Sequence, residues 1–127
     1  MKITGFCPLI VTKDPESVMK VFEELGFERR HTKKDIEGGT VTSYSMKDVN
    51  GFRINIAASE NMEKDLTSMS MNVDNFQEAY DFFISKGYVN PRGDKVTDTS
   101  SSRATMLISP SGFPITISEH IKKGNRE

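Results

Sequence analysis

This chain of 127 residues has so few cysteines and histidines that any metal chemistry would have to come mostly from carboxylates. There is one cysteine, Cys7, and there are two histidines, His31 and His120. One cysteine cannot form an internal disulfide, and no Cys-x-x-Cys pair offers a zinc or redox site. Glu119 and His120 could meet His31 in an unusual acid–base or metal site. Alternatively, His120 lies beside a charged tail as a solvated surface residue.

Arg53 and Cys7 each have a chemical and a structural interpretation. An arginine in a binding site can hold a carboxylate or phosphate through two parallel hydrogen bonds. Arg53 could instead form a cross-strand ion pair with Asp48, worth only about 0–1 kcal/mol if exposed. Cys7 could be a reactive thiol, but it has no basic neighbour in sequence, and a buried free cysteine usually behaves as a small apolar residue. The sequence leaves both choices open.

Composition excludes several classes of protein. The chain has 17 Lys and Arg against 18 Asp and Glu, a formal charge of −1. It has no basic stripe with interleaved aromatics, so we expect no nucleic-acid partner. No apolar run approaches the roughly 20 residues that span a bilayer, so we expect no membrane partner. The first residues form no export signal, and a cytoplasmic location is the default expectation.

The sequence contains an internal repeat. Sliding it against itself by 61 positions aligns two clusters of glycines and apolar residues without an insertion. The aligned pairs are Phe22 with Phe83, Gly26 with Gly87, Phe27 with Tyr88, Gly51 with Gly112, Phe52 with Phe113, Ile54 with Ile115 and Ile56 with Ile117. Their order argues for a duplication.

Each half is predicted to start with a strand, continue with a helix and end with three strands. In the first half Asp14 is the predicted helix N-cap and Gly26 ends the helix. In the second, Asp74 and Gln77 form a pair resembling a capping box, and Gly87 ends the helix. The predicted strands are residues 3–12, 27–34, 40–47 and 52–59, then 67–73, 88–92, 102–109 and 113–120, with a polar loop at 94–102.

Three segments carry a resemblance to a known family: Leu25-Gly26-Phe27 after the first helix, and the hairpins at residues 48–56 and 109–117. Together they resemble the glyoxalase/bleomycin-resistance/dioxygenase (vicinal oxygen chelate) superfamily over nearly the whole chain. The resemblance implies an α+β fold, in which two tandem βαβββ modules form a cupped mixed β-sheet or half-barrel with helices on its outer face. The modules would be residues 1–60 and 66–121 of one domain, with 122–127 as a frayed tail.

The resemblance also locates the family's metal ligands. Metal-dependent members have one ligand on the first and one on the last strand of each half, which here are Cys7, Asn55, Ser68 and Thr116. Family enzymes have His, Glu or Gln there, because divalent ions of this kind prefer imidazole and carboxylate donors. We therefore predict no metal and no cofactor.

Strand alternation predicts which side chains line the cup. If Ile54 and Ile56 face the helix, Arg53 and Asn55 face the cup. A two-residue turn at Asn50-Gly51 would place Tyr44 and Met46 of the partner strand on the cup face as well. A longer turn would change these cross-strand partners. The predicted ligand-binding residues are Arg53, Asn55, Tyr44, Met46, Ser68, Ser70, Thr116 and Cys7, with apolar surface from Leu9, Val11 and Leu107.

The favoured function is metal-free binding of a small polar or anionic organic molecule in this cup, in the manner of bleomycin-resistance proteins; catalytic residues are unknown. One alternative is a divalent-metal-dependent lyase, isomerase or dioxygenase of the family, with a displaced site at His31, Glu119 and His120. Another is a dimeric structural or regulatory protein. Members of the family commonly pair across chains, so a homodimer is expected.

Overall fold

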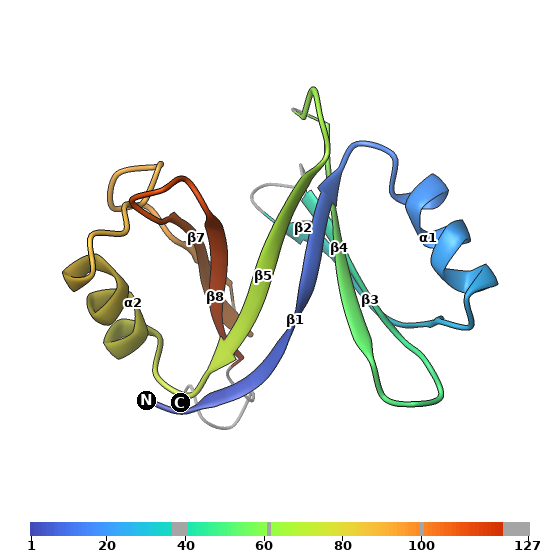
Figure 1. Ribbon diagram of the computed structural model, residues 1–127, viewed down its shortest axis with the longest axis horizontal. Helices are drawn as coiled ribbons and strands as arrows, with labels where there is room; N and C mark the ends of the chain where they lie inside the picture. Colours follow the sequence, from blue (N-terminus) through green and yellow to red (C-terminus); the bar gives the residue numbers. More distant parts are fainter. Residues whose placement is uncertain (37–40, 61, 100, 121–127) are drawn as a thin grey trace. The chain divides into compact units, whose positions relative to one another are not determined.

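The computed structural model describes residues 1–36, 41–60, 62–99 and 101–120, which contain two helices and eight strands (Figure 1). In chain order these are β1 (Ile3–Thr12), α1 (Pro15–Glu24), β2 (Glu28–Ile36), β3 (Val41–Lys47), β4 (Arg53–Ser59), β5 (Leu66–Val73), α2 (Phe76–Ser85), β6 (Thr97–Asp98), β7 (Ser102–Ile108) and β8 (Pro114–His120). Neither helix is long and apolar enough to cross a lipid bilayer.

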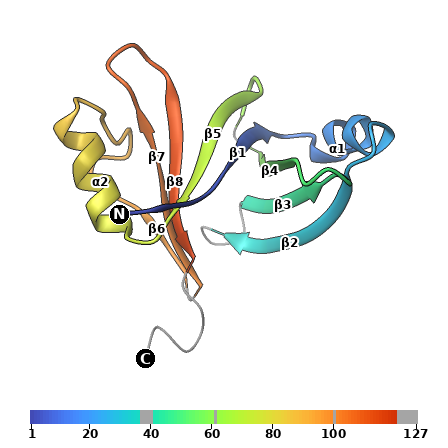
Figure 2. The ribbon, with the colours of Figure 1, turned by 60° about the horizontal axis from the view of Figure 1, so that its bottom comes forward.

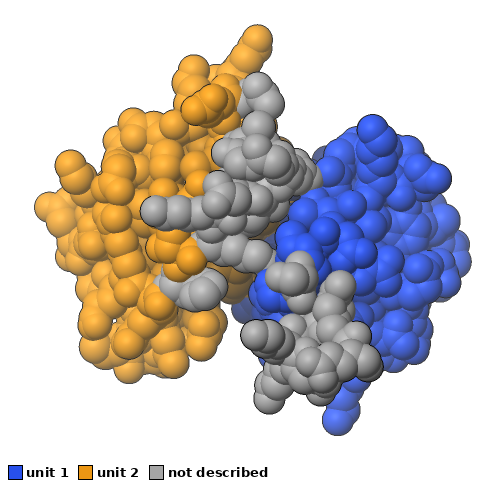
Figure 3. Space-filling view, turned by 180° about the vertical axis from the view of Figure 1, so that it is seen from behind, with its two compact units in different colours: residues 1–6, 69–127 blue, residues 7–68 orange. Residues whose placement is uncertain are grey.

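The strands form a mixed sheet in the order β2-β3-β4-β1-β5-β8-β7-β6. Strand β1 runs parallel to β4, and β5 runs parallel to β8, while the hairpins β3–β4 and β7–β8 are antiparallel. The chain divides into two compact units, which Figure 3 colours separately. Unit 2 is Cys7–Ser68, and unit 1 combines Met1–Phe6 with Met69–Glu127. Strands β1 and β5 each contribute to both units.

The predicted duplication is confirmed by the backbone pairing. Helix α2 occupies the positions of α1 moved on by 61 residues, and β7 and β8 likewise repeat β3 and β4. The register repeats as well, because Leu9 pairs with Asn55 and the equivalent Ser70 pairs with Thr116. The whole β3–β4 ladder, from residue 41 opposite 59 to residue 47 opposite 53, recurs in β7–β8. The fold is α+β and contains one βαβββ module twice.

The helix caps are equivalent in the two halves, which corrects one prediction. The Asp14 carboxylate accepts the N–H of the residue three positions on at 3.2 Å, as predicted. In the second half the N-cap is Asn75, whose side chain makes the same bond at 3.0 Å. The prediction of Asp74 was wrong by one residue, because its carboxylate instead accepts the Lys2 N–H at 2.6 Å. Gln77 likewise bonds to the next helical turn and not to the cap.

In each unit the helix lies along one face of the strands (Figure 2). Apolar side chains are buried between the helix and that face. The buried residues of unit 2 are Met19, Met46, Ile54 and Ile56, with Ile10, Val18, Phe22, Phe27 and Tyr44 packed against them. Those of unit 1 are Met71, Val73, Phe76, Ala79, Phe83, Leu107, Ile115 and Ile117, with Met69, Tyr80, Tyr88 and Val96 packed against them. Alternate strand residues therefore face the helix, and those between them point to the opposite, helix-free face.

The turn between β3 and β4 determines which side chains of the two strands face the helix. It spans residues 48–52, where the Asp48 carboxylate accepts the N–H groups of Asn50 at 3.0 Å and Phe52 at 2.8 Å. Gly51 has φ of +89°, a conformation open to glycine at little cost. The turn is one register step longer than the predicted two-residue turn, so Asn55 pairs with Ser45.

This register overturns the predicted orientation of Tyr44 and Met46. A shift of one residue moves every side chain of a strand to the other face. Tyr44 lies opposite Ile56 and Met46 opposite Ile54, so both pack toward α1. Leu107, the counterpart of Met46 in the second half, is buried beneath α2. None of the three lines the helix-free face.

The second half departs from the first after its helix. The strand predicted at 88–92 is reduced to a single bridge between Val89 and Ile108. The side chain of Asn90 accepts the Arg92 N–H at 2.9 Å, which closes a turn where the first half continues β2. The short strand β6 then forms inside the segment that was predicted to be a loop.

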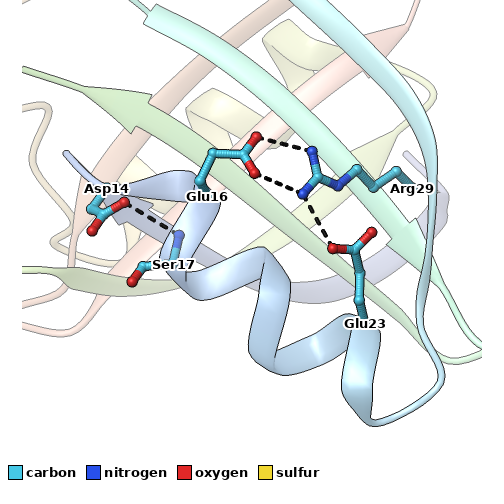
Figure 4. A network of polar contacts seen from close by, with 5 residues as sticks. All are labelled: Asp14, Glu16, Ser17, Glu23 and Arg29. Carbon is cyan, nitrogen blue, oxygen red and sulfur yellow. Dashed lines mark hydrogen bonds and ion pairs between the residues drawn. The ribbon is translucent and has the colours of Figure 1, made fainter.

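In unit 2 an ion-pair network fastens α1 to β2 (Figure 4). The Arg29 guanidinium donates to both carboxylate oxygens of Glu16, at 3.0 and 2.9 Å, and to Glu23 at 3.2 Å. Arg29 therefore points to the helix side of the sheet. The hydrogen bonds from Arg29 lower the pKa of Glu16, and those to Glu16 and Glu23 raise the pKa of Arg29.

We expect the contribution of this network to stability to depend on pH. Because the folded-state pKa of Glu16 lies below its unfolded value of 4.5, the stabilisation is complete above pH 4.5 and is lost as the pH falls through the folded-state pKa. Urea unfolding of the wild type and Arg29→Gln at pH 7 and pH 3 measures this. The difference between their midpoints should shrink at pH 3, and an equal difference at both pH values would contradict the assignment.

The observed register makes a second prediction. Met46 is fully buried, so Met46→Ala should lower the free energy of unfolding by about 2–5 kcal/mol. Ser45→Ala, one residue away on the other face, should change it by about 0.5 kcal/mol or less. Denaturant unfolding measures both variants, and a larger effect at Ser45 would support the shorter turn instead.

Candidate functional site

Three of the predicted site residues meet on the helix-free face of unit 2. They are Cys7 on β1, and Arg53 and Asn55 on the neighbouring strand β4. Leu9 pairs with Asn55, which places Cys7 two residues further toward Arg53. The Cys7 side chain bonds to the backbone of Asn55 and lies within electrostatic range of Arg53. Arg53 is exposed, whereas Cys7 and Asn55 are half-buried.

The environment of Cys7 favours the neutral thiol. Burial raises the pKa of the thiol, and this outweighs the opposing effects of the Arg53 charge and the hydrogen bond to the Asn55 backbone. A thiol attacks electrophiles and binds metals as its thiolate, so a raised pKa reduces both reactivities at neutral pH. The sequence had shown no basic neighbour for Cys7, and the fold supplies one in Arg53. Its effect on the pKa is smaller than that of burial.

The predicted alternative for Arg53, an ion pair with Asp48, does not form. The residue opposite Arg53 is Lys47, because the longer turn brings Asp48 opposite Phe52. The Asp48 carboxylate is held in the turn by the N–H groups of Asn50 and Phe52. Within the described segments no ion pair links Asp48 to Arg53. The guanidinium thus keeps its hydrogen-bonding capacity for other groups.

The helix-free face of unit 1 carries hydroxyl and amide groups. Ser70 on β5 pairs with Thr116 on β8, and Asn72 pairs with Ser118. The Ser118 hydroxyl donates to the Asn72 side-chain oxygen at 2.6 Å. Ser68, the last residue of unit 2, is 2% exposed. These groups can form hydrogen bonds but carry no charge.

The alternative site at His31, Glu119 and His120 receives no support from the described residues. The Glu119 carboxylate accepts the Phe76 N–H at 2.7 Å and so satisfies the first turn of α2 on the helix side. His120 follows directly and is exposed, on the other side of the strand. The side chain of His31 lies outside the part of the chain whose side chains are described. Among the described residues no three His, Cys, Asp or Glu side chains gather as metal ligands.

Sequence reasoning missed one charged residue of this face, Lys47. A two-residue turn at Asn50-Gly51 would place it on the helix side. The signal that could have found it is the duplication, because Ser109 and Gly112 repeat the positions of Asp48 and Gly51. The Ser109 hydroxyl accepts the N–H of Phe113 at 2.8 Å, which is the counterpart of the Asp48 bond.

No protein-family model matches the chain, and neither does any curated protein. Solved structures do match. Methylmalonyl-CoA epimerase from Mycobacterium tuberculosis has a TM-score of 0.73 at 14% identity, with 98% of this chain and 93% of that chain covered. The chain has the glyoxalase fold. A glyoxalase/bleomycin resistance protein/dioxygenase superfamily member from Vibrio splendidus has a TM-score of 0.61 at 13% identity, over 93% of this chain and 99% of its own.

Glyoxalase I from Zea mays has a TM-score of 0.65 at 15% identity and matches 97% of this chain, which corresponds to 47% of the plant protein. This chain therefore spans about half the length of that enzyme. Identities this low show the glyoxalase fold and leave the chemistry to be argued from the side chains.

The residues predicted at the family's metal positions do not fit a divalent ion. Asn55, Ser68 and Thr116 are neutral and offer neither imidazole nor carboxylate. The fourth position, Cys7, would have to lose its proton to bind a metal, and its raised pKa opposes this. We therefore derive no chemical step through a metal here.

The thiol provides a direct test of this description. Alkylation of Cys7 by iodoacetamide should follow a pKa above the ordinary value of about 8.5. Arg53→Gln should raise the pKa further and slow the reaction, because the Arg53 charge lowers the pKa. Arg29→Gln removes an equal charge on the other face and should leave the rate unchanged. Faster alkylation of Arg53→Gln than of the wild type would contradict the placement of Arg53 beside Cys7.

Proposed function

We propose that this protein binds a small anionic organic molecule without a metal, on the helix-free face of unit 2, with Arg53 as the main contact. The observation that carries the proposal is the exposed guanidinium of Arg53 on the helix-free face of β4. Among the described residues it forms no ion pair with a carboxylate. A guanidinium presents donors in a planar fork that matches a carboxylate, sulfate or phosphate.

The neighbours of Arg53 support an organic ligand. Asn55 follows on the same strand face and adds an amide, which can donate and accept hydrogen bonds. Leu9 and Val11 on β1 pair with Asn55 and Ala57, so they add apolar surface to this face. A few polar groups placed among apolar ones are typical of small-molecule sites. The hydroxyl groups Ser70 and Thr116 of unit 1 stay predictions as ligand contacts.

Metal-dependent catalysis is the second candidate, and the similar structures favour it, because they include an epimerase and glyoxalase I. Its weakness is the donor set described above. A homodimer also stays a prediction, which light scattering of the purified protein would test. A cytoplasmic location also stays a prediction.

Isothermal titration with benzoate and phenyl sulfate tests the proposed function. The wild type should bind both anions, and Arg53→Gln should weaken binding at least about tenfold, since a hydrogen bond to a charged group contributes about 1.5–3 kcal/mol. Arg53→Lys should recover part of the affinity through its charge alone. Arg29→Gln, which removes the same charge from the other face, should bind as the wild type does.

Elemental analysis of the protein, before and after chelator treatment, separates the two candidates. Stoichiometric divalent metal that resists dialysis would favour the enzyme and defeat the metal-free proposal. Equal anion affinity of the wild type and Arg53→Gln would also defeat it.

A further inference from the structure

A second cation lies directly opposite Arg53. Lys47 on β3 is its cross-strand partner in the antiparallel β3–β4 pair. Side chains that are directly opposite share a face, with Cβ atoms about 4.5–5.5 Å apart. Met46, the residue before Lys47, is buried against the helix, so Lys47 points to the helix-free face with Arg53. Two like charges in this arrangement repel each other, and a bound anion would relieve the repulsion.

The charged groups around this pair leave it with a positive balance. Glu28 on β2 lies opposite Lys47, and its carboxylate is 3.9 Å from the guanidinium of Arg30. Among the described residues neither Lys47 nor Arg53 forms an ion pair. On the β1 side the neighbour is Cys7, a half-buried thiol. Apart from Asp48, whose carboxylate is held in the turn, three cations among the described side chains therefore share this corner with one carboxylate, that of Glu28.

The other half of the duplication shows that the fold does not require these charges. Ile108 and Pro114 occupy the positions equivalent to Lys47 and Arg53, with the same pairing between them. The same backbone is thus built with two neutral residues in unit 1. Two cations that repel each other across this ladder are unfavourable for stability. Their presence in unit 2 points to a bound anion.

We propose that Lys47 and Arg53 together select a doubly charged head group, so that the ligand class is small phosphate monoesters. This inference rests on the proposed function, because it assigns a ligand class to the same face. A phosphate monoester carries two negative charges above its second pKa of about 6 and presents three acceptor oxygens. Lys47 supplies a point charge and Arg53 a planar fork, so the two can contact different oxygens of one phosphate. The organic part then lies along Asn55 toward Val11 and Ala57.

Phenyl phosphate and phenyl sulfate at pH 8 test the inference, because they have the same shape and differ by one negative charge. The full-length wild type should bind phenyl phosphate at least about fivefold more tightly, the factor for one extra charge contact in water. Lys47→Gln should lower this ratio toward one while phenyl sulfate still binds. Lys20→Gln, a lysine lost from α1 on the other side of the sheet, should leave the ratio unchanged.

The outcomes separate this inference from the proposed function. A ratio near one in the wild type, or a ratio that Lys47→Gln leaves unchanged, overturns the selection of dianions. In that case Arg53-dependent binding of phenyl sulfate would still support the proposed function. Failure of both anions to bind the wild type overturns both. Circular dichroism of each variant establishes that it is folded, and since Arg53 is exposed and Lys47 lies outside the apolar core, we expect unchanged spectra.

Discussion

The turn at residues 48–52 is the constraint on which the chemistry of unit 2 depends. A strand has a side-chain period of two, so a turn that pairs Lys47 with Arg53 sends Met46 and Ile54 together into the core. The turn is held by the Asp48 carboxylate, which accepts two backbone N–H groups. The same carboxylate is thereby withheld from Arg53. One side chain thus stabilises the observed register and, among the described residues, leaves the Arg53 guanidinium without an acidic partner.

Duplication makes it possible to separate what the fold needs from what a site needs. The two halves share their helix positions, their caps and their strand register. They share apolar residues at the core positions, such as Ile54 and Ile115, since each helix must cover an apolar face. They differ on the helix-free face, where unit 2 has charges and unit 1 has hydroxyl groups. That difference has no cause in folding, so function is the place to look for its cause.

The sequence correctly predicted the repeat, both helices and every expected strand except the one at 88–92, because these depend on local signals. Glycine at the helix ends, apolar residues at helical spacing and alternation in strands all act within a few residues. Register was predicted wrongly because Asn50-Gly51 is the usual two-residue hairpin turn, whereas the Asp48 carboxylate stabilises a longer turn by accepting N–H groups two and four residues further on. Both signals are local, and the sequence does not rank them. Asp74 and Asn75 are both good caps, and only the contact of Asp74 with Lys2 decides between them.

The site was predictable only where the face of a side chain follows from its own strand. Arg53 and Asn55 were assigned to the helix-free face from their own strand, where the two isoleucines left no choice. Lys47, Tyr44 and Met46 lie on the partner strand, so their faces depended on the turn. The residues predicted at the family's metal positions include no carboxylate and no imidazole, which are the donors that a divalent ion of this kind prefers. Two adjacent cations can still bind an anionic ligand. Binding requires only that the contacts with the ligand's charge stabilise it by more than its removal from water costs.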